Sequence, residues 1–417
     1  MPLPRLVSIA GTPGPAAPSG TPGPGSPDGT GGSGSPERHG GNLAEAAARL
    51  GCRPEQLLDA SASLVPFAPP AALRRALRQA CRAPGLRPYP DRRYTALRQV
   101  IAALHDLDPD WVLPGNGAAE LFTWAGRDAA ALGPSLLPAP GFADYRRALT
   151  CWDGEARSVP LPLRWDGAGP SAWPLPPSAG AGALWITNPH NPTGQLWSRA
   201  SLELLLQNHP LVICDEAFLP LVPGGEAQSL LPLLADHPNL VVIRSLTKLF
   251  AIAGLRLGYA LASPERLARW SAWRDPWPVN GLAAAAGEAL LADRRAYGRW
   301  CDRVQGWVAR EGGWLQQQLA ALPGLIPMPS AANYLLIRGE RQGRPLSLEP
   351  LRLALEQRHR ILLRDCRSFE GLGETWLRLG LQDRAGHRRI VRALVEELRR
   401  GALPGSPRET LRMELSR

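Results

Sequence analysis

Apolar residues in the middle of the chain occur in short runs that are bounded by turn residues. Three of these runs cover residues 183–187, 211–214 and 240–244, and they contain β-branched side chains. Runs of this length are typical of strands that are buried on both faces of a parallel sheet. Helical patterns fit between them, so the sequence predicts an α/β domain with a mostly parallel sheet.

Other segments repeat their apolar residues with the period of a helix. Helices are expected at residues 71–81, 94–107 and over most of 281–322. Beyond residue 322, strand and helix patterns alternate. The expected strands cover residues 333–338, 361–365 and 375–381, and the expected helices cover 351–360 and 385–399. This alternation predicts a second, smaller α+β domain.

The first 38 residues consist almost entirely of Gly, Pro, Ser, Thr and Ala. A segment of this composition buries too little apolar surface to offset the entropy lost on ordering, so a disordered tail is expected at residues 1–38. We expect an N-terminal arm with part of the small domain at residues 39–70, the large domain at 71–280, the small domain at 281–400 and a second tail at 401–417.

Composition narrows the class of protein. Hydrophobic residues make up 44% of the 417 residues, and no apolar run reaches the ~18 residues of a membrane-spanning helix. The six cysteines are scattered without a CxxC pair, which argues against a disulfide framework or a metal site and predicts a cytoplasmic protein. The net charge of +10 is spread along the chain, so it indicates a basic surface or an anionic small molecule rather than nucleic acid.

Lys248 is the only lysine among the 47 lysine and arginine residues. Arginine replaces lysine in most surface roles, but its guanidinium stays protonated and cannot attack a carbonyl. A lysine amine can do so and forms a Schiff base. The alternative is that Lys248 was retained by chance.

The residues after the predicted strands suit an aldehyde cofactor that carries a pyridine ring and a phosphate. Ligands of open α/β sheets bind at the carboxyl ends of the strands. Lys248 supplies an amine for the aldehyde, Asp215 a carboxylate for the pyridine nitrogen, and Asn191 a donor for the ring oxygen O3′. Taken singly, Asp215 fits a helix cap and Asn191 a turn residue equally well.

An anion site is expected close to these residues. The glycines at 115 and 117 precede a helical pattern, and a helix start offers backbone N–H groups to a phosphate. Ser245, Thr247 and Arg256 add hydroxyl and guanidinium donors. The glycine loop alone is weak evidence, because such loops are more often simple turns.

Three motifs together resemble those of the fold-type-I, pyridoxal-phosphate-dependent aminotransferase family. They are Asn188-Pro-His-Asn-Pro-Thr-Gly194, Asp215-Glu-Ala-Phe218, and Ser245-x-x-Lys248 followed by Arg256. The resemblance covers about residues 38–398. It implies a large domain that binds pyridoxal 5′-phosphate and a smaller α+β domain.

The resemblance also implies a role for individual residues. Lys248 and Asp215 would be the catalytic residues, with Lys248 bonded to the cofactor aldehyde and Asp215 paired with the ring nitrogen. Asn191 would contact O3′. The implied phosphate ligands are Asn116, Gly117, Ser245, Thr247 and Arg256.

Members of this family are dimers that share their active sites, so a homodimer is expected. Phe142, in Pro140-Gly-Phe142, matches the aromatic residue that stacks on the cofactor ring. Tyr89 matches the tyrosine that reaches the cofactor phosphate of the partner subunit.

Within the family, the N-terminal segment and Phe218 resemble the threonine-phosphate decarboxylases of cobalamin biosynthesis. The matching segments are His39-Gly-Gly-Asn42, Ala46-Ala-Ala-Arg-Leu-Gly51 and Leu57-Leu-Asp-Ala-Ser61. This resemblance implies decarboxylation of L-threonine O-3-phosphate to 1-amino-2-propanol phosphate. The alternatives are an aminotransferase of the histidinol-phosphate type or one for another amino acid. A cofactor-sensing transcription regulator would need a DNA-binding domain, for which residues 1–38 are too short.

The resemblance assigns the substrate's anionic groups to Arg364, Arg378 and His39, the last at the phosphate. His39 as a loop residue without a role is the alternative. Ser63 and Val65 stand where the family has two asparagines near the substrate, which leaves the exact substrate open. His190 is expected to be an exposed loop residue rather than a catalytic acid.

Overall fold

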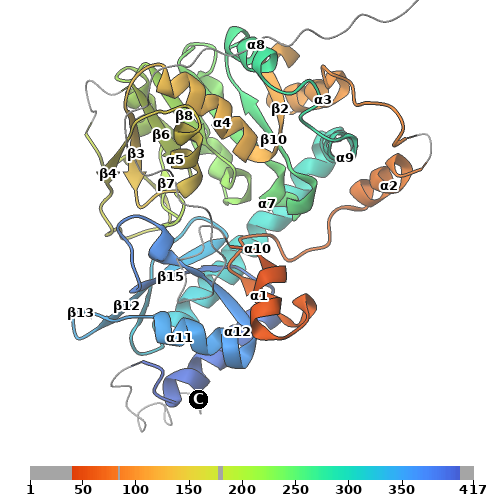
Figure 1. Ribbon diagram of the computed structural model, residues 1–417. Coiled ribbons are helices and arrows are strands. Elements are labelled where there is room, and N and C mark those ends of the chain that lie inside the picture. The colour runs from red at the N-terminus through yellow and green to blue at the C-terminus, as the bar shows by residue number, and fades with distance from the viewer. Residues whose placement is uncertain (1–39, 83–84, 177–181, 404–417) are drawn as a thin grey trace, which may run out of the picture. The chain divides into compact units, whose positions relative to one another are not determined.

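The computed structural model describes residues 40–82, 85–176 and 182–403. The predicted tail of residues 1–38, His39 and most of the second predicted tail lie outside these residues. The described chain is built around two sheets (Figure 1).

The first sheet has seven strands in the order β2-β10-β9-β8-β6-β3-β4. All of its strands run parallel except β10, which is antiparallel to both β2 and β9. The strands are β2 (Val112–Asn116), β3 (Ser135–Ala139), β4 (Ala156–Pro160), β6 (Ala183–Thr187), β8 (Leu211–Asp215), β9 (Leu240–Ser245) and β10 (Leu257–Leu261). The prediction of a mostly parallel sheet is therefore confirmed.

Both faces of this sheet are covered, because successive side chains on each strand point in opposite directions. Ile213 packs in one apolar cluster with residues of α4, α5 and α8, while Val212 packs in another with residues of α3, α6 and α9. These helices are α3 (Thr95–His105), α4 (Gly117–Ala130), α5 (Ala143–Thr150), α6 (Arg199–Leu206), α8 (Pro264–Trp273) and α9 (Gly281–Leu291). Double coverage explains why β6, β8 and β9 read as continuous apolar runs.

The second sheet has the order β1-β14-β15-β12-β11, and β13 pairs with β12. Its strands are β1 (Leu58–Ala60), β11 (Leu325–Pro327), β12 (Tyr334–Arg341), β13 (Arg344–Pro345), β14 (Ile361–Asp365) and β15 (Trp376–Gly380). The associated helices are α10 (Arg294–Ala320), α11 (Glu349–Ala354) and α12 (Arg384–Arg399). The short strands β5 (Pro170–Ser171) and β7 (Leu196–Trp197) form a separate pair.

The N-terminal segment joins the second sheet, although most of that sheet comes from the C-terminal part of the chain. Strand β1 pairs in parallel with β14. Helix α1 (Leu43–Leu50) lies near α11 and α12 in Figure 1, and its Arg49 forms a 2.8 Å ion pair with Glu356. Segments 40–63 and 361–380 are thereby brought together.

The predicted helices at residues 71–81 and 94–107 are confirmed as α2 (Ala71–Ala80) and α3. Both pack against α9, which follows the predicted domain boundary at residue 280. Helices α9, α10 and α12 each begin after a side chain that accepts backbone N–H groups, which stabilises their first turns. These capping residues are Asn280, Asp293 and Asp383.

Candidate active site

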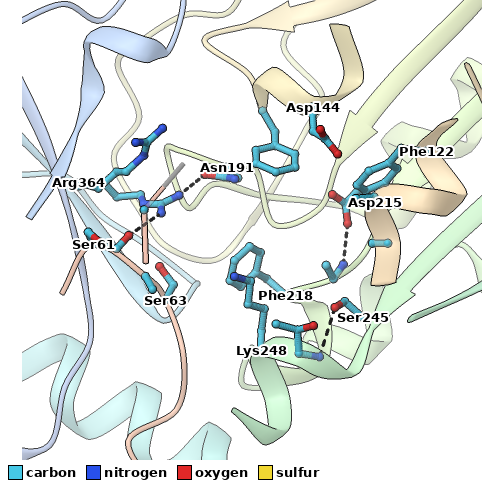
Figure 2. A pocket seen from close by; sticks show the side chains of 18 of the residues that line it. Ser61, Ser63, Phe122, Asp144, Asn191, Asp215, Phe218, Ser245, Lys248 and Arg364 are labelled. Atoms are coloured by element: carbon cyan, nitrogen blue, oxygen red, sulfur yellow. Dashed lines mark hydrogen bonds between the residues drawn. The ribbon is translucent and has the colours of Figure 1, made fainter. Parts of the chain in front are cut away.

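A pocket of about 200 Å³ lies at the carboxyl ends of β6, β8 and β9. One wall comes from the first sheet and its helices, and the other from β14, β15 and the segment after β1. Figure 2 shows Ser61 and Arg364 on one side and Asp215 and Ser245 on the other. The predicted site residues that line it are Phe142, Asn191, Asp215, Ser245, Thr247, Lys248, Arg256, Arg364 and Arg378.

Lys248 lies on the five-residue helix α7 (Leu246–Phe250), which begins directly after β9. Ser245 caps this helix by accepting the N–H of Thr247 at 3.3 Å. The pKa of Lys248 is lowered to about 8, chiefly by removal from bulk water and in addition by the positive charges of Arg378 and Arg256. An amine with this pKa is partly neutral near pH 7–8, which is the form that attacks a carbonyl.

Asp215 ends β8 and is buried in the pocket wall. Tyr145 donates a hydrogen bond to Asp215 Oδ2 at 2.6 Å, and the N–H of Ala217 donates to Oδ1 at 2.9 Å. Burial raises the pKa of Asp215 to about 6, and these two hydrogen bonds act against the rise. The pocket therefore holds a carboxylate that gains from a cationic partner such as a protonated pyridine nitrogen.

Tyr145 was not among the predicted site residues. Its hydroxyl also lies 2.7 Å from Thr187 Oγ1, at the end of β6, and its ring stacks on Trp185 with centroids 5.1 Å apart. Tyr145 lies three residues after Phe142 at the start of α5, a spacing that places two side chains on the same face of a helix. That spacing is the signal in the sequence that could have identified it.

Asn191 lies in the turn after β6. Its side-chain oxygen accepts a short hydrogen bond from Arg378 Nη1, so it joins the two walls of the pocket. His190, expected to be exposed, is buried, and this expectation is wrong. The His190 ring lies 2.8 Å from Thr193 Oγ1, and burial lowers its pKa to about 3. Packing of the small-domain wall over the turn, with Tyr334 donating to the His190 carbonyl, removes it from solvent.

The candidate phosphate site lies where α4 begins. Gly117 has a φ of +73°, and a Cβ at this position would lie 2.6 Å from Arg256 Nη2, so a glycine is needed. Asn116 and Gly117 do not line the pocket, whereas Ala118 and Ala119 do. The N–H of Asn116 is already bonded to Glu120 Oε2 at 2.7 Å.

The two candidate substrate arginines are buried side by side on the second sheet. Arg364 on β14 and Arg378 on β15 are directly opposite each other in the antiparallel pairing. Arg364 donates to Ser368 Oγ at 2.6 Å, and Arg378 donates to the Ser61 carbonyl at 3.3 Å. Neighbouring strands thus present two guanidinium groups to one pocket.

Ser63 and Val65, the two departures from the family pattern, are both buried. Ser63 lines the pocket, and its buried hydroxyl has no hydrogen-bond partner among the described residues. A buried hydroxyl without a partner is unfavourable unless a ligand supplies one.

Aromatic residues form part of the pocket wall. Phe142 contacts Phe122 edge to face with ring centroids 6.4 Å apart, and both line the pocket. Lys248 Nζ lies 5.6 Å from the ring centroid of Phe218. The aromatic rings give the pocket an apolar surface against which a planar ring ligand can pack.

Tyr89 does not line the pocket of its own chain. It is 77% exposed and stacks on Trp277 with centroids 4.4 Å apart. The guanidinium of Arg92 lies 4.6 Å from the same tryptophan ring. A role of Tyr89 in a partner subunit stays a prediction, as does the role of His39.

Two further searches cover only the described part of the chain. No group of His, Cys, Asp and Glu residues there has the arrangement of a metal site. No helix there is long and apolar enough to cross a membrane.

Residues 56–394 match the family model "Aminotransferase class I and II", so the chain belongs to this family. It is 37% identical to the threonine-phosphate decarboxylase of Salmonella typhimurium over 85% of this chain and 94% of that protein. It is 35% identical to the histidinol-phosphate aminotransferase of Symbiobacterium thermophilum over 75% of this chain and 83% of that protein.

Solved structures show the same fold. The histidinol-phosphate aminotransferase of Sinorhizobium meliloti, in complex with pyridoxal 5′-phosphate, matches with a TM-score of 0.71 at 21% identity and covers 85% of this chain and 94% of its own. The L-threonine-O-3-phosphate decarboxylase of Porphyromonas gingivalis matches with a TM-score of 0.68 at 24% identity. The match covers 81% of this chain and 98% of that protein. The predicted family and fold class are confirmed.

The residues of the pocket fit pyridoxal 5′-phosphate, the cofactor predicted from the sequence. The groups that line the cavity include the amine of Lys248, the buried carboxylate of Asp215 and the ring of Phe142. They also include the hydroxyls of Ser245 and Thr247 and the guanidinium of Arg256. Within the described part of the chain, the buried carboxylate of Asp215 accepts hydrogen bonds from neutral donors only, and a protonated ring nitrogen would supply a cationic one.

Proposed function

We propose that this chain is a pyridoxal-phosphate-dependent enzyme that decarboxylates L-threonine O-3-phosphate to 1-amino-2-propanol phosphate for cobalamin biosynthesis. The observation that carries the proposal is the pair Arg364 and Arg378 opposite the wall that holds Lys248 and Asp215. Two guanidinium groups match a substrate that carries both a carboxylate and a phosphate. The 37% identity to the Salmonella decarboxylase supports the same substrate.

Each group has a distinct task in this reaction. When bound, pyridoxal phosphate supplies an aldehyde for the substrate amine and a ring that accepts the electron pair of the broken bond. Asp215 holds the proton at the ring nitrogen. Arg378 and Arg364 would hold the two anionic groups of the substrate and thereby fix the orientation of the bond from Cα to the carboxylate. After CO₂ leaves, Lys248 donates a proton to Cα.

An aminotransferase of the histidinol-phosphate type is the second candidate, favoured by the 35% identical relative from Symbiobacterium. Histidinol phosphate carries a phosphate but no carboxylate. It would therefore occupy only one of Arg364 and Arg378, which is why we place it second.

One experiment separates the two candidates. The purified protein, loaded with pyridoxal phosphate, is given L-threonine O-3-phosphate with and without a keto acid. We expect release of CO₂ and an equal amount of phosphorylated amino alcohol, independent of the keto acid. Amino transfer that depends on the keto acid, without CO₂, would contradict decarboxylation and favour the second candidate. Unphosphorylated L-threonine is the control substrate and should react slowly.

A further inference from the structure

Two charged residues lie behind the candidate cofactor site. Glu216 follows Asp215 at the end of β8, and Arg244 precedes Ser245 at the end of β9. Successive strand residues point to opposite faces, so Asp215 and Ser245 line the pocket while Glu216 and Arg244 do not. The side chains of Glu216 and Arg244 are only 0% and 1% exposed.

The two side chains form an ion pair that is fully satisfied by protein groups. Arg244 Nη2 lies 2.7 Å from Glu216 Oε2, and Arg244 Nε donates to the same oxygen at 2.9 Å. Glu216 also accepts from Ser229 Oγ and from the N–H of Leu230, each at 2.8 Å. Glu226 binds the other edge of Arg244 with two contacts of 2.7 and 2.9 Å. The pair therefore needs no ligand of its own.

The ion pair crosses from β8 to β9 where both strands end. The N–H of Glu216 also donates to the Ile243 carbonyl at 2.9 Å, so the two chain segments are joined by backbone and side chains at one point. Their neighbours are assigned to different groups of the cofactor: Asp215 is the candidate partner of the ring nitrogen, and Ser245 is a candidate phosphate ligand. The separation of these two groups thus depends on how firmly the strand ends are held.

We propose that the Glu216–Arg244 ion pair is a positioning element, which fixes Asp215 relative to Ser245 and thereby the placement of bound pyridoxal phosphate. The proposal rests on the proposed function, because it requires that the pocket binds this cofactor. General stabilisation is the competing explanation. Buried ion pairs are often no more stabilising than apolar residues of similar size, so stability alone is a weak reason for a charged pair here.

The test is a double-mutant cycle that joins Arg244→Lys with Asp215→Asn. Lysine keeps the charge of Arg244 but lacks the fork that contacts both Glu216 and Glu226. We expect Arg244→Lys to lower kcat by roughly tenfold to hundredfold, the range for a group displaced by up to about 1 Å, and to leave KM nearly unchanged. It should also weaken pyridoxal phosphate binding to the cofactor-free protein, measured by absorbance titration.

The cycle separates positioning from simple destabilisation. If Arg244 acts through Asp215, Arg244→Lys lowers kcat by a clearly smaller factor in the Asp215→Asn background than in the wild type. The carboxylate that Arg244 would position is then already absent. Independent costs in the two backgrounds would overturn the proposal. So would an Arg244→Lys protein with wild-type cofactor affinity and kcat.

A matched control comes from a second, partly buried ion pair, which joins α8 to α4. Arg266 and Asp128 are paired with side chains 13% and 8% exposed, and neither lines the pocket. Arg266→Lys should lower thermal stability but leave cofactor affinity unchanged. If Arg244→Lys does not fold, Glu226→Gln replaces it. Glu226 is 48% exposed, and its replacement weakens only the contact on the outer edge of Arg244 and leaves the ion pair with Glu216 in place. A smaller loss of cofactor affinity is then expected. An unchanged cofactor affinity would overturn the proposal.

The two proposals fail in different ways. A wild-type chain that binds no pyridoxal phosphate would contradict the proposed function. A wild-type chain that binds it, with variants of the ion pair that match the Arg266→Lys control, would contradict the positioning role alone.

Discussion

Arg364 and Arg378 occupy directly opposed positions on two antiparallel strands, and both side chains line one pocket. Like charges repel each other more strongly in a buried site than in water. Arg378 donates only to neutral acceptors in the described contacts, the Asn191 side chain and the Ser61 carbonyl, and burial lowers its pKa. A ligand with two anionic groups would relieve this repulsion.

The first prediction assigns one anionic group to each arginine. Arg364→Ala should raise KM for threonine phosphate far more than for threonine if it binds phosphate. Arg378→Ala should raise both equally if it binds the carboxylate. Each increase should be about tenfold to hundredfold, because hydrogen bonds to charged groups contribute about 1.5–3 kcal/mol. Steady-state kinetics with both substrates provide the measurement.

Two controls accompany this prediction. Arg→Lys at either position should not restore binding, because an ammonium lacks the planar fork of a guanidinium. Arg367→Ala removes a neighbouring arginine that is paired with Asp365 and does not line the pocket, so it should leave both KM values unchanged. If neither Arg364 nor Arg378 distinguishes the two substrates, a phosphorylated substrate is the wrong assignment.

The second prediction concerns the single lysine. Lys248→Arg and Lys248→Ala should abolish turnover and the visible absorption of bound cofactor, since neither offers an amine. Borohydride reduction of the loaded wild type should label one internal peptide, the one that contains Lys248. Because the pKa of Lys248 is lowered to about 8, uptake of pyridoxal phosphate should become faster as the pH rises through 8. Activity retained in Lys248→Arg would contradict the assignment.

The sequence was sufficient to predict the residues whose position follows from a strand end. Lys248, Asp215 and Asn191 each come just after a recognisable apolar run, and all three line the pocket. The spacing from Phe142 could have placed Tyr145 on the same helix face, but its bond to Asp215 joins residues 70 positions apart, and local patterns do not determine such a contact. The burial of His190 was missed for the same reason, since Tyr334 covers it from a distant strand.

The sequence also predicted part of the fold, namely the strands that have a local pattern, but not the pairing of distant strands. The parallel strands β6, β8 and β9 were recognisable because both of their faces are buried. The parallel strands β2, β3 and β4 and the antiparallel strand β10, which follows the Lys248 motif, were not predicted. The pairing of β1 with β14 joins residues about 300 positions apart, which no local pattern indicates. Ser61 and Ser63 thus enter the pocket through long-range topology.

The third prediction concerns the cost of the buried carboxyl group. The pKa of Asp215 is raised from 3.8 to about 6, so the folded cofactor-free protein binds more protons than the unfolded chain between these values. Its stability therefore falls as the pH rises through this window. Asp215→Asn should stabilise the cofactor-free protein at pH 7 by up to about 3 kcal/mol, since each pKa unit corresponds to about 1.4 kcal/mol. The difference should disappear toward pH 4.

Urea unfolding of both proteins at several pH values measures this difference. The same Asp215→Asn variant should bind cofactor but lose most of its turnover, because an amide cannot hold the ring nitrogen protonated. Tyr145→Phe is the companion variant: loss of its 2.6 Å hydrogen bond should move the pKa of Asp215 above 6. Equal stability of wild type and Asp215→Asn at all pH values would show that the carboxyl group is not perturbed.

The last prediction tests whether two subunits share their active sites. Tyr89 is exposed and does not line its own pocket, as expected of a residue that reaches the cofactor phosphate in a partner. Tyr89→Ala and Lys248→Ala should each be nearly inactive as homodimers. Mixed and reassociated, they should regain activity, because one site of the hybrid combines the intact Lys248 of one chain with the intact Tyr89 of the other. The control variant is Leu204→Ala, which changes another exposed apolar residue. It should be active as a homodimer, without mixing with Lys248→Ala. Hybrids that stay inactive, in a protein that light scattering shows to be dimeric, would place Tyr89 outside the shared site.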